Sequence, residues 1–215
     1  MRPPTRDALL GLGTVKIFEA GETILRQGDE STHVVLLLHG SAKVQAVSAA
    51  GGFALLGVRF GGDLVGEMAA MEQRPRSAMV TAGTRARAKL VKSADFNDFL
   101  HRHADASFEL TRMVNERLRW ANRRRVDNAQ HSAPDRVQRV LLEVMQTYGV
   151  LDRDGSHRLG TPLSHDDLAS LSGVRRRTVE KVLHGLEKQG IVLRRYRQVI
   201  VTDLDELRRL LGDSG

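Results

Sequence analysis

Between Gly11 and Val91 the chain alternates short apolar runs with glycine, a punctuation that favours strands over helices. Short strands at this spacing predict an antiparallel barrel or sandwich. Val34 to Leu38 is apolar throughout and predicts a strand covered on both faces, whereas Arg85 to Leu90 alternates basic and apolar residues and predicts one face in water. The remaining predicted elements are strands at Thr23 to Arg26, at Ala42 to Val47 before Gly51-Gly52, at Phe53 to Phe60 and from Arg76-Ser77-Ala78 onward, with one helical turn at Met68 to Met71.

Helical spacing takes over near Ser93, and the longest helix is predicted from about Asp105 to Ala129. Its apolar stripe steps by four, four and three residues through Leu110, Val114, Leu118 and Ala121. Such a stripe either pairs two helices in a dimer or packs the helix on its own barrel, and the periodicity favours neither alternative. Beyond Arg123 the helix is much more polar, so pairing is predicted for its first half.

Pro134 predicts a break between two helices, because proline suits the first turn of a helix and disfavours helix in the residue before it. The next helix is predicted from Arg136 to about Tyr148, with Gly149 ending it. The polar stretch from Asp152 to Pro162 is interpreted as a loop. A last helix, capped by Thr202-Asp203, is predicted to run through Leu211.

The segment from Ser164 to Val201 has the pattern of a winged helix-turn-helix. Ser164 and Asp167 have the spacing of a capping box at the start of a first helix, and Gly173 permits the tight turn after it. In the second helix an apolar stripe turns inward, which leaves a cationic and hydroxyl face outside. The inward residues are Val179, Leu183 and Leu186, and the outward residues are Arg176, Arg177, Thr178 and Lys181. Two apolar runs around a basic connector, Ile191 to Leu193 and Val199 to Val201, complete the predicted wing.

The outward face of the second helix has the chemistry that DNA recognition requires. Arg and Lys reach guanine O6 and N7 in the major groove, and small polar groups bind phosphates. The alternative is that Arg175-Arg176-Arg177 is only a solvated charged surface. The capped helix before it, the glycine turn and the basic hairpin after it favour DNA binding.

Composition supports a polyanionic partner. The 215 residues allow two domains, each with its own core, and carry a net charge of +7. Eight Lys and Arg face four Asp and Glu between Ser164 and Ile200, whereas the first 103 residues hold thirteen against ten. The excess of positive charge therefore lies over the predicted DNA-binding segment.

The absence of cysteine excludes disulfides, thiolate metal sites and iron–sulfur clusters, and it fits a reducing compartment. The opening residues lack the apolar core of a signal peptide, and no run reaches membrane-spanning length. We therefore expect a soluble, cytoplasmic protein that has no membrane partner. None of the histidines forms an i, i+4 ligand pair, so we expect no metal.

In this order of elements, roughly residues 15 to 202 resemble the CRP/FNR family of bacterial transcription regulators. The shared motifs are Leu25-Arg26-Gln27-Gly28-Asp29, Leu37-Leu38-His39-Gly40-Ser41, Gly61-Gly62-Asp63-Leu64-Val65-Gly66-Glu67, Arg76-Ser77-Ala78 and the block from Ser164 to Glu187. The resemblance implies an α+β fold: a jelly-roll effector barrel over residues 1–104, a dimerisation helix and hinge over 105–133, and a winged helix-turn-helix over 134–215. It also implies a homodimer, a near-palindromic DNA operator and contact with RNA polymerase, for which the predicted 152–162 loop is a candidate surface.

The resemblance further implies a cyclic-nucleotide site in the barrel, with cyclic AMP the favoured ligand. Gly66 would approach the ligand closely, Glu67 would accept a hydrogen bond from the ribose, and Arg76 and Ser77 would bind the cyclic phosphate. Where the best-known member holds the base with Thr and Ser, this chain has Ala121 and Asn122, and only Asn122 can bind an adenine edge. The alternative is a structural ion pair between Glu67 and Arg76 in a barrel without a ligand.

On the DNA-binding helix, the resemblance implies roles for Arg175, Arg176, Arg177, Thr178 and Lys181. Arg177 replaces a glutamate of the best-known member, so a different base preference is expected there. Arg175 replaces the usual capping serine and is interpreted as a phosphate contact, as are Arg194, Arg195 and Arg197 of the wing.

Two other functions are compatible with parts of this pattern. One alternative is the same DNA-binding regulator with haem or another small molecule as its effector, or with no effector. An enzyme that uses the barrel as its substrate pocket is disfavoured, since the chain has no pattern typical of a nucleophile–base pair or a metal cluster.

Overall fold

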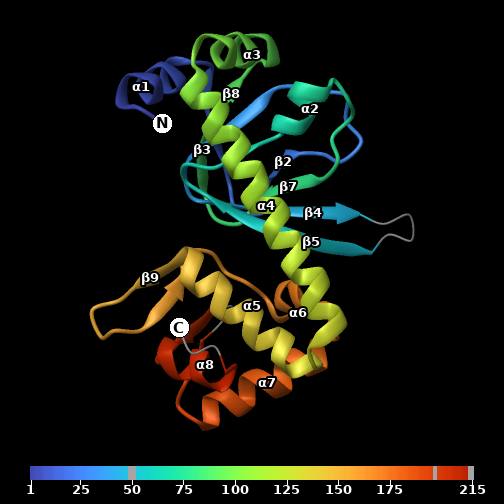
Figure 1. Ribbon diagram of the computed structural model, residues 1–215, viewed down its shortest axis with the longest axis vertical. Helices are drawn as coiled ribbons and strands as arrows, with labels where there is room; N and C mark the ends of the chain where they lie inside the picture. The colour runs from blue at the N-terminus through green and yellow to red at the C-terminus, as the bar shows by residue number, and fades with distance from the viewer. Residues whose placement is uncertain (48–51, 196–197, 213–215) are drawn as a thin grey trace. The chain divides into compact units, whose positions relative to one another are not determined.

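The computed structural model describes residues 1–47, 52–195 and 198–212 and divides into two compact units, Met1–Ala121 and Asn122–Gly215. Gly51 of the predicted glycine pair and Arg197 of the predicted wing lie outside the described residues. Over those described ranges, no helix has the length and apolar character needed to cross a membrane. The predicted α+β class is confirmed, because sheets and helices are present in both units (Figure 1).

The described strands of the first unit form two antiparallel four-stranded sheets (Figure 1). The first has the order β1 (Thr14–Phe18), β8 (Ala86–Val91), β3 (Val34–His39) and β6 (Leu64–Val65). The second has the order β2 (Thr23–Leu25), β7 (Met79–Ala82), β4 (Ser41–Val47) and β5 (Phe53–Phe60). Both sheets contribute to one apolar cluster, so the predicted barrel has a shared core.

Strand β3 is buried on both faces, as its continuous apolar run predicts. Val35 and Leu37 belong to the core shared by the two sheets, while Val34 and Leu36 belong to a second cluster. Helices α1 (Pro3–Gly11) and α3 (Ser93–Arg102) and the start of α4 contribute most of the other residues of that cluster, and Ala70 and Val91 complete it. Helix α1 was not predicted, since its apolar residues are few and its neighbours are polar or proline.

Helix α4 (Ala104–Gln130) resolves part of the ambiguity in its apolar stripe. Leu110 is buried in the cluster of the first unit, so the N-terminal part of the helix packs on its own domain. Val114 and Leu118 remain 40% and 56% exposed. The first residue of the stripe is therefore buried, whereas Val114 and Leu118 face solvent and are available to a second helix.

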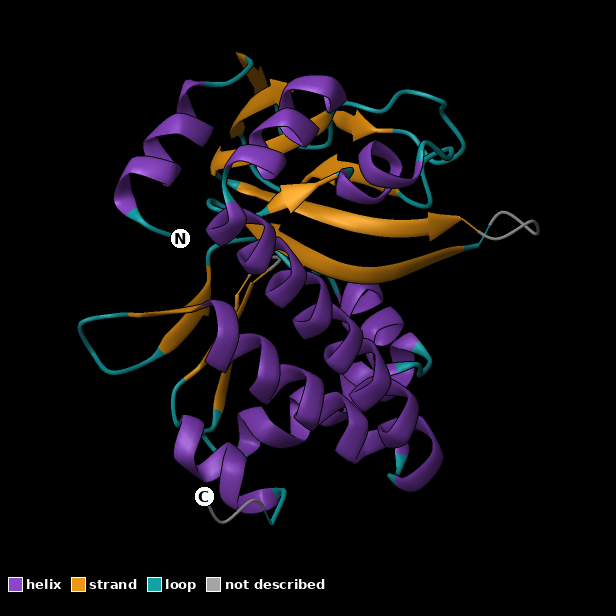
Figure 2. Cartoon of the chain, turned by 45° about the horizontal axis from the view of Figure 1, so that its top comes forward, coloured by secondary structure: helices purple, strands orange, loops and turns teal. Residues whose placement is uncertain are grey.

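In the second unit, α5 (Ala133–Tyr148) starts three residues earlier than predicted. The Ser132 side chain accepts a hydrogen bond from the Asp135 backbone amide, and Pro134 occupies the first turn, so the cap and the proline begin the helix together. Helices α6 (His165–Ser172), α7 (Arg176–Lys188) and α8 (Leu204–Leu210) follow. Figure 2 shows these helices beside the strands of the same unit.

The interpretation of residues 152–162 as a loop is wrong in part. His157–Leu159 forms strand β10, which lies between β12 (Gln198–Val201) and β9 (Gly149–Leu151) in a sheet completed by β11 (Val192–Arg195). Arg158 is opposite Ile200 on one side and Val150 on the other. A three-residue strand with two polar side chains has no apolar period of its own, so partner strands decide its conformation.

The start of α4 makes a pH-sensitive contact with the N-terminal segment. Asp105 accepts hydrogen bonds from the Arg2 backbone amide at 2.9 Å and the Thr5 hydroxyl at 3.1 Å. The Arg2 amide is the main cause that lowers the pKa of Asp105 from 3.8 to about 2. A carboxyl with a depressed folded pKa stabilises the fold above its unfolded pKa, and this contribution disappears as the pH falls through the folded pKa.

We therefore expect Asp105→Asn to lower the urea midpoint of unfolding above pH 3.8, and the gap from wild type to close as the pH falls from 3.8 toward about 2. Urea titrations across that pH range measure the gap. A gap that does not change with pH would assign the effect of the substitution to packing.

Candidate functional site

Arg76 lies in the connection between α2 (Glu67–Glu72) and β7, and its side chain is held inside the first unit. The residue is 3% exposed. Its Nη2 donates to the His33 carbonyl at 2.6 Å, its Nη1 to the Gly66 carbonyl at 2.9 Å, and its Nε to the Ser31 hydroxyl at 3.3 Å. All three acceptors are neutral, so the guanidinium is oriented without being neutralised.

The charge of Arg76 therefore has no anionic partner in contact. Among the described residues, no carboxylate lies within ion-pair distance of this guanidinium. Burial lowers the pKa of Arg76, and the more distant Glu67 and Asp29 only partly offset that effect. A buried cation is costly unless it is paired, and guanidinium binds phosphate through charge-assisted hydrogen bonds. This arrangement suits an anionic ligand.

Gly66 packs directly against this guanidinium. Its φ of 81° lies in the left-handed region, and a Cβ at this position would be 2.4 Å from Arg76 Nη1. The close approach therefore requires glycine at this position. Ser77, the neighbour of Arg76, is exposed, and its hydroxyl is 3.9 Å from the Met68 sulfur.

Glu67 is buried, but its partner is not the one that the ion-pair alternative assumed. Its Oε1 lies 2.7 Å from Nη1 of Arg117 on α4, and the other nitrogen of that guanidinium donates to the Leu64 carbonyl at 2.7 Å. The alternative of a Glu67–Arg76 ion pair is therefore wrong. The structure brings Gly66, Glu67 and Arg76 together within one segment and adds Arg117 to them.

Arg117 is the residue of this site that the sequence interpretation missed. It follows the inward-facing Leu110 and Met113 at helical spacing, so a cation stands on a stripe that should be apolar. That position was the available signal. Asn122 lies on α4 as the first residue of the second unit, where it is exposed.

His33 also borders Arg76. Burial, followed by the positive charges of Arg76 and Lys16, lowers the pKa of the His33 imidazole, which favours its neutral form. Across residues 1–47, 52–195 and 198–212, no group of three His, Asp or Glu side chains is placed to hold a metal ion.

The second candidate site is the exposed side of α7. The preceding helix α6 begins with the predicted capping box and ends at the left-handed Gly173. Val179, Leu183 and Leu186 of α7 are buried, as predicted. Arg175 is the N-cap residue but its side chain makes no capping bond, so its guanidinium is not used to start the helix. The predicted contact residues Arg175, Arg176, Arg177 and Lys181 are exposed, and Thr178 is half-buried.

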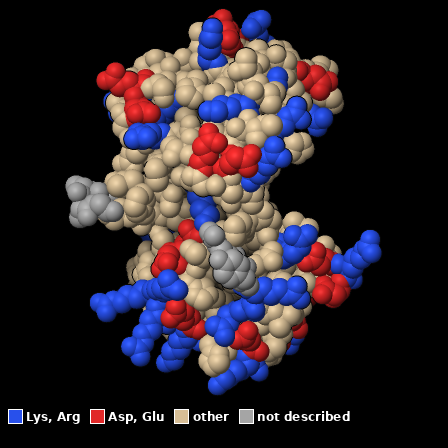
Figure 3. Space-filling view, turned by 180° about the vertical axis from the view of Figure 1, so that it is seen from behind, with Lys and Arg blue, Asp and Glu red and all other residues tan. Residues whose placement is uncertain are grey.

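These cations differ in what they already bind. Arg176 pairs with Glu180 at 2.8 Å and Asp166 at 3.1 Å, and Arg194 of the wing pairs with Glu187. Within the part of the chain that the structure describes, Arg175, Arg177 and Lys181 form no ion pair. Figure 3 shows many Lys and Arg side chains projecting from this unit. Such a surface matches the charge of a DNA backbone.

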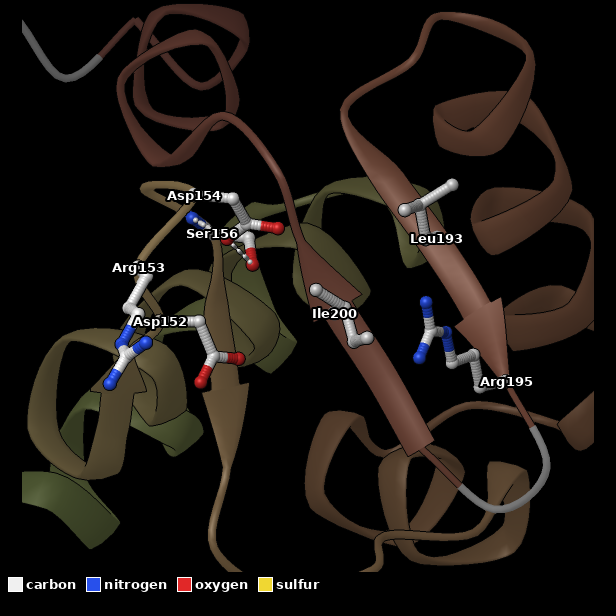
Figure 4. A pocket seen from close by; sticks show the side chains of 7 residues that line it. All are labelled: Asp152, Arg153, Asp154, Ser156, Leu193, Arg195 and Ile200. Carbon is white, nitrogen blue, oxygen red and sulfur yellow. Dashed lines mark hydrogen bonds between the residues drawn. The ribbon is translucent and has the colours of Figure 1, made fainter.

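A depression also opens on the wing sheet of the second unit (Figure 4). Its lining consists of Asp152, Arg153, Asp154, Ser156, Leu193, Arg195 and Ile200. Asp154 already accepts hydrogen bonds from the amide and hydroxyl of Ser156, which lower the pKa of its carboxyl, and Asp152 pairs with Arg158 at 2.8 Å. The carboxylates of Asp152 and Asp154 therefore have partners within the hairpin, whereas Arg76 of the first unit has no anionic partner among the described residues.

Comparison with known proteins assigns both units. Residues 15–103 match the cyclic nucleotide-binding domain family, and residues 135–210 match the Crp-like helix-turn-helix domain family. The CRP-like cAMP-activated global transcriptional regulator of Mycobacterium tuberculosis is 26% identical over 192 residues, which cover 89% of this chain and 85% of that protein.

Solved structures agree in fold. FixK2 from Bradyrhizobium japonicum has a TM-score of 0.80 at 20% identity, and the match covers 95% of this chain and 100% of that chain. The c-di-GMP-responsive global regulator CLP of Xanthomonas campestris has a TM-score of 0.77 at 20% identity, covering 94% of this chain and 100% of that chain. With a cyclic nucleotide-binding domain followed by a Crp-like helix-turn-helix, the chain belongs to the CRP/FNR family of DNA-binding transcription regulators.

Proposed function

We propose that the protein is a homodimeric regulator whose affinity for a near-palindromic operator is controlled by cyclic AMP bound in the first unit. One observation carries the effector part of this proposal: Arg76 is 3% exposed and has only neutral acceptors around it. A cyclic phosphate would supply the anion that this guanidinium lacks.

The residues around Arg76 have complementary tasks in this proposal. Gly66 lets the Arg76 guanidinium lie against the backbone that would approach the ligand, and Ser77 donates its exposed hydroxyl to the phosphate. The Glu67 carboxylate, oriented by Arg117, accepts a hydrogen bond from the ribose. Asn122 offers its amide to the adenine edge, where Ala121 contributes nothing polar.

The choice of cyclic AMP rests on the named activity of the Mycobacterium tuberculosis relative and on the Asn122 amide. Phosphate binding alone does not select a base, and the fold neighbour CLP is c-di-GMP-responsive. A guanine-containing cyclic nucleotide is therefore the main competitor, and direct comparison of cyclic AMP with cyclic GMP and with c-di-GMP distinguishes these ligands.

The DNA part of the proposal uses two copies of α7. The solvent-facing stripe of α4 pairs the subunits, and the recognition helices then enter successive major grooves about 34 Å apart. Arg177 and Lys181 read base edges, while Arg175 and Thr178 bind phosphates. The wing arginines Arg194 and Arg195 add backbone contacts, and residues 152–162 are the proposed surface for RNA polymerase.

Effector control requires that cyclic AMP binds the DNA-competent state more tightly than the other state. Linkage then demands that operator DNA tightens cyclic AMP binding by the same factor by which cyclic AMP tightens DNA binding, for which about 5- to 150-fold is typical. Isothermal titration with cyclic AMP and with cyclic GMP, each with and without a selected operator duplex, measures that factor. Equal cyclic AMP affinities with and without operator would refute effector control, and preference for cyclic GMP would change the ligand.

A further inference from the structure

Arg176 stands apart from the other cations of α7 because two carboxylates hold it. Its Nε donates to Glu180 Oε1 at 2.8 Å, one turn along the same helix, and its Nη1 donates to Asp166 Oδ2 at 3.1 Å, on α6. The hydrogen bond from Arg176 lowers the pKa of Glu180, so this carboxylate is ionised at neutral pH. The three side chains therefore link the two helices of the helix-turn-helix.

This arrangement restricts which part of the guanidinium can meet DNA. Arginine has five N–H donors in a planar fork. Glu180 occupies the Nε edge and Asp166 takes one donor of Nη1, which leaves Nη2 and the second Nη1 hydrogen. Guanine O6 and N7 accept such guanidinium donors in the major groove. The end of the guanidinium that carries Nη2 can therefore still bind a guanine.

The same carboxylates disfavour the other use of an arginine, which is binding any phosphate it meets. A guanidinium that turned toward the backbone would leave both partners, and the two carboxylates would then face the phosphates unpaired. Arg175, Arg177 and Lys181 carry no such restraint among the described residues. Arg176 is thus the cation of this helix that gains least from non-specific DNA.

We propose that Glu180, together with Asp166, is a positioning residue that determines DNA specificity. It holds the Arg176 guanidinium in an orientation that suits a base edge rather than a phosphate. This inference rests on the proposed DNA-binding function. It assigns to an acidic residue of the recognition helix a role in rejecting wrong sequences, which is a recognised route to specificity.

The test compares wild type, Glu180→Gln and Glu206→Gln on two duplexes of equal length. One duplex is the sequence that wild type selects from a randomised pool, and the other is its scrambled version. Glu206 of α8 pairs with Arg209 at 2.6 Å, so its substitution removes one half-buried carboxylate of the same domain outside the helix-turn-helix. Affinities are measured by fluorescence anisotropy over a range of salt concentrations, with saturating cyclic AMP.

For Glu180→Gln we expect the preference for the selected duplex to fall by about tenfold, within the range that one bidentate base contact supplies. On scrambled DNA we expect the slope of log affinity against log salt to steepen by about 0.9, the value for one additional phosphate contact. Glu206→Gln should change neither quantity. A merely structural Glu180 would weaken both duplexes equally and leave the salt slope unchanged.

The inference is overturned if wild type selects a sequence and Glu180→Gln keeps the same preference and salt slope. If wild type selects no sequence at all, the proposed DNA-binding function fails first and the inference falls with it. Asp166→Asn, which removes the second partner, should shift both quantities in the same direction as Glu180→Gln.

Discussion

Replacing Arg76 with alanine is expected to weaken cyclic AMP binding by at least about 30-fold, or about 2 kcal/mol. The substitution removes the only buried cation that contacts the Gly66 backbone in the described first unit. A cyclic phosphate would then enter a partly dry site without a charge-assisted donor. Titration calorimetry with cyclic AMP measures the loss.

Arg76 also stabilises the fold, and controls must separate this structural role from its role in ligand binding. Loss of Arg76 leaves the His33 and Gly66 carbonyls without this donor, so the variant should also unfold at lower urea concentration. Arg76→Lys retains the charge and should recover part of the affinity without the fork geometry. Arg74→Ala removes an exposed arginine from the same connection and should bind normally. A folded Arg76→Ala protein with the affinity of Arg74→Ala would refute the proposed site.

Leu118→Glu is expected to convert the proposed homodimer into monomers and to abolish operator binding at concentrations where the wild type binds its operator. Leu118 is 56% exposed on the solvent-facing stripe of α4. Burying one leucine from each subunit contributes roughly 1.5–3 kcal/mol per side chain. Because only about half of each Leu118 remains to be buried, its loss should raise the dimer dissociation constant by more than about 10-fold, before the cost of burying two carboxylates is added.

Analytical ultracentrifugation of the variant measures its mass, and anisotropy with the selected duplex measures its DNA binding. A monomer carries one recognition helix and can engage only one half-site, so both signals should change together. Leu210→Glu is the matched control, since Leu210 is 46% exposed on α8. Should Leu118→Glu sediment as wild type does, the α4 stripe would not be the dimer contact.

The local conformation of most of the DNA-binding segment can be predicted from short sequence patterns. The capping box between Ser164 and Asp167, the left-handed Gly173 and the inward stripe of α7 all occur as predicted. Each depends on residues no more than a few positions apart, where backbone hydrogen bonding and helical periodicity decide the conformation. The double-sided burial of β3 follows for the same reason, because a continuous apolar run leaves no face for water.

Other features depend on partners that are distant in the chain. Strand β10 has two polar residues among three, so only its alignment with β9 and β12 makes it a strand. The pairing of Arg176 with both Asp166 and Glu180 likewise requires the angle between two helices, which no local pattern states.

Local patterns predicted most strands of the first unit and the recognition helix with its outward cations, but neither helix α1 nor strand β10. Gly66, Glu67 and Arg76 became candidate ligand residues through the family resemblance. The partners of the buried charges could not be predicted from the sequence, because the fold sets them. It paired Glu67 with Arg117 from 50 positions away and left Arg76 buried among neutral acceptors. The physical reason is that burial and ion pairing depend on distances in space, and packing of α4 against the barrel sets those distances.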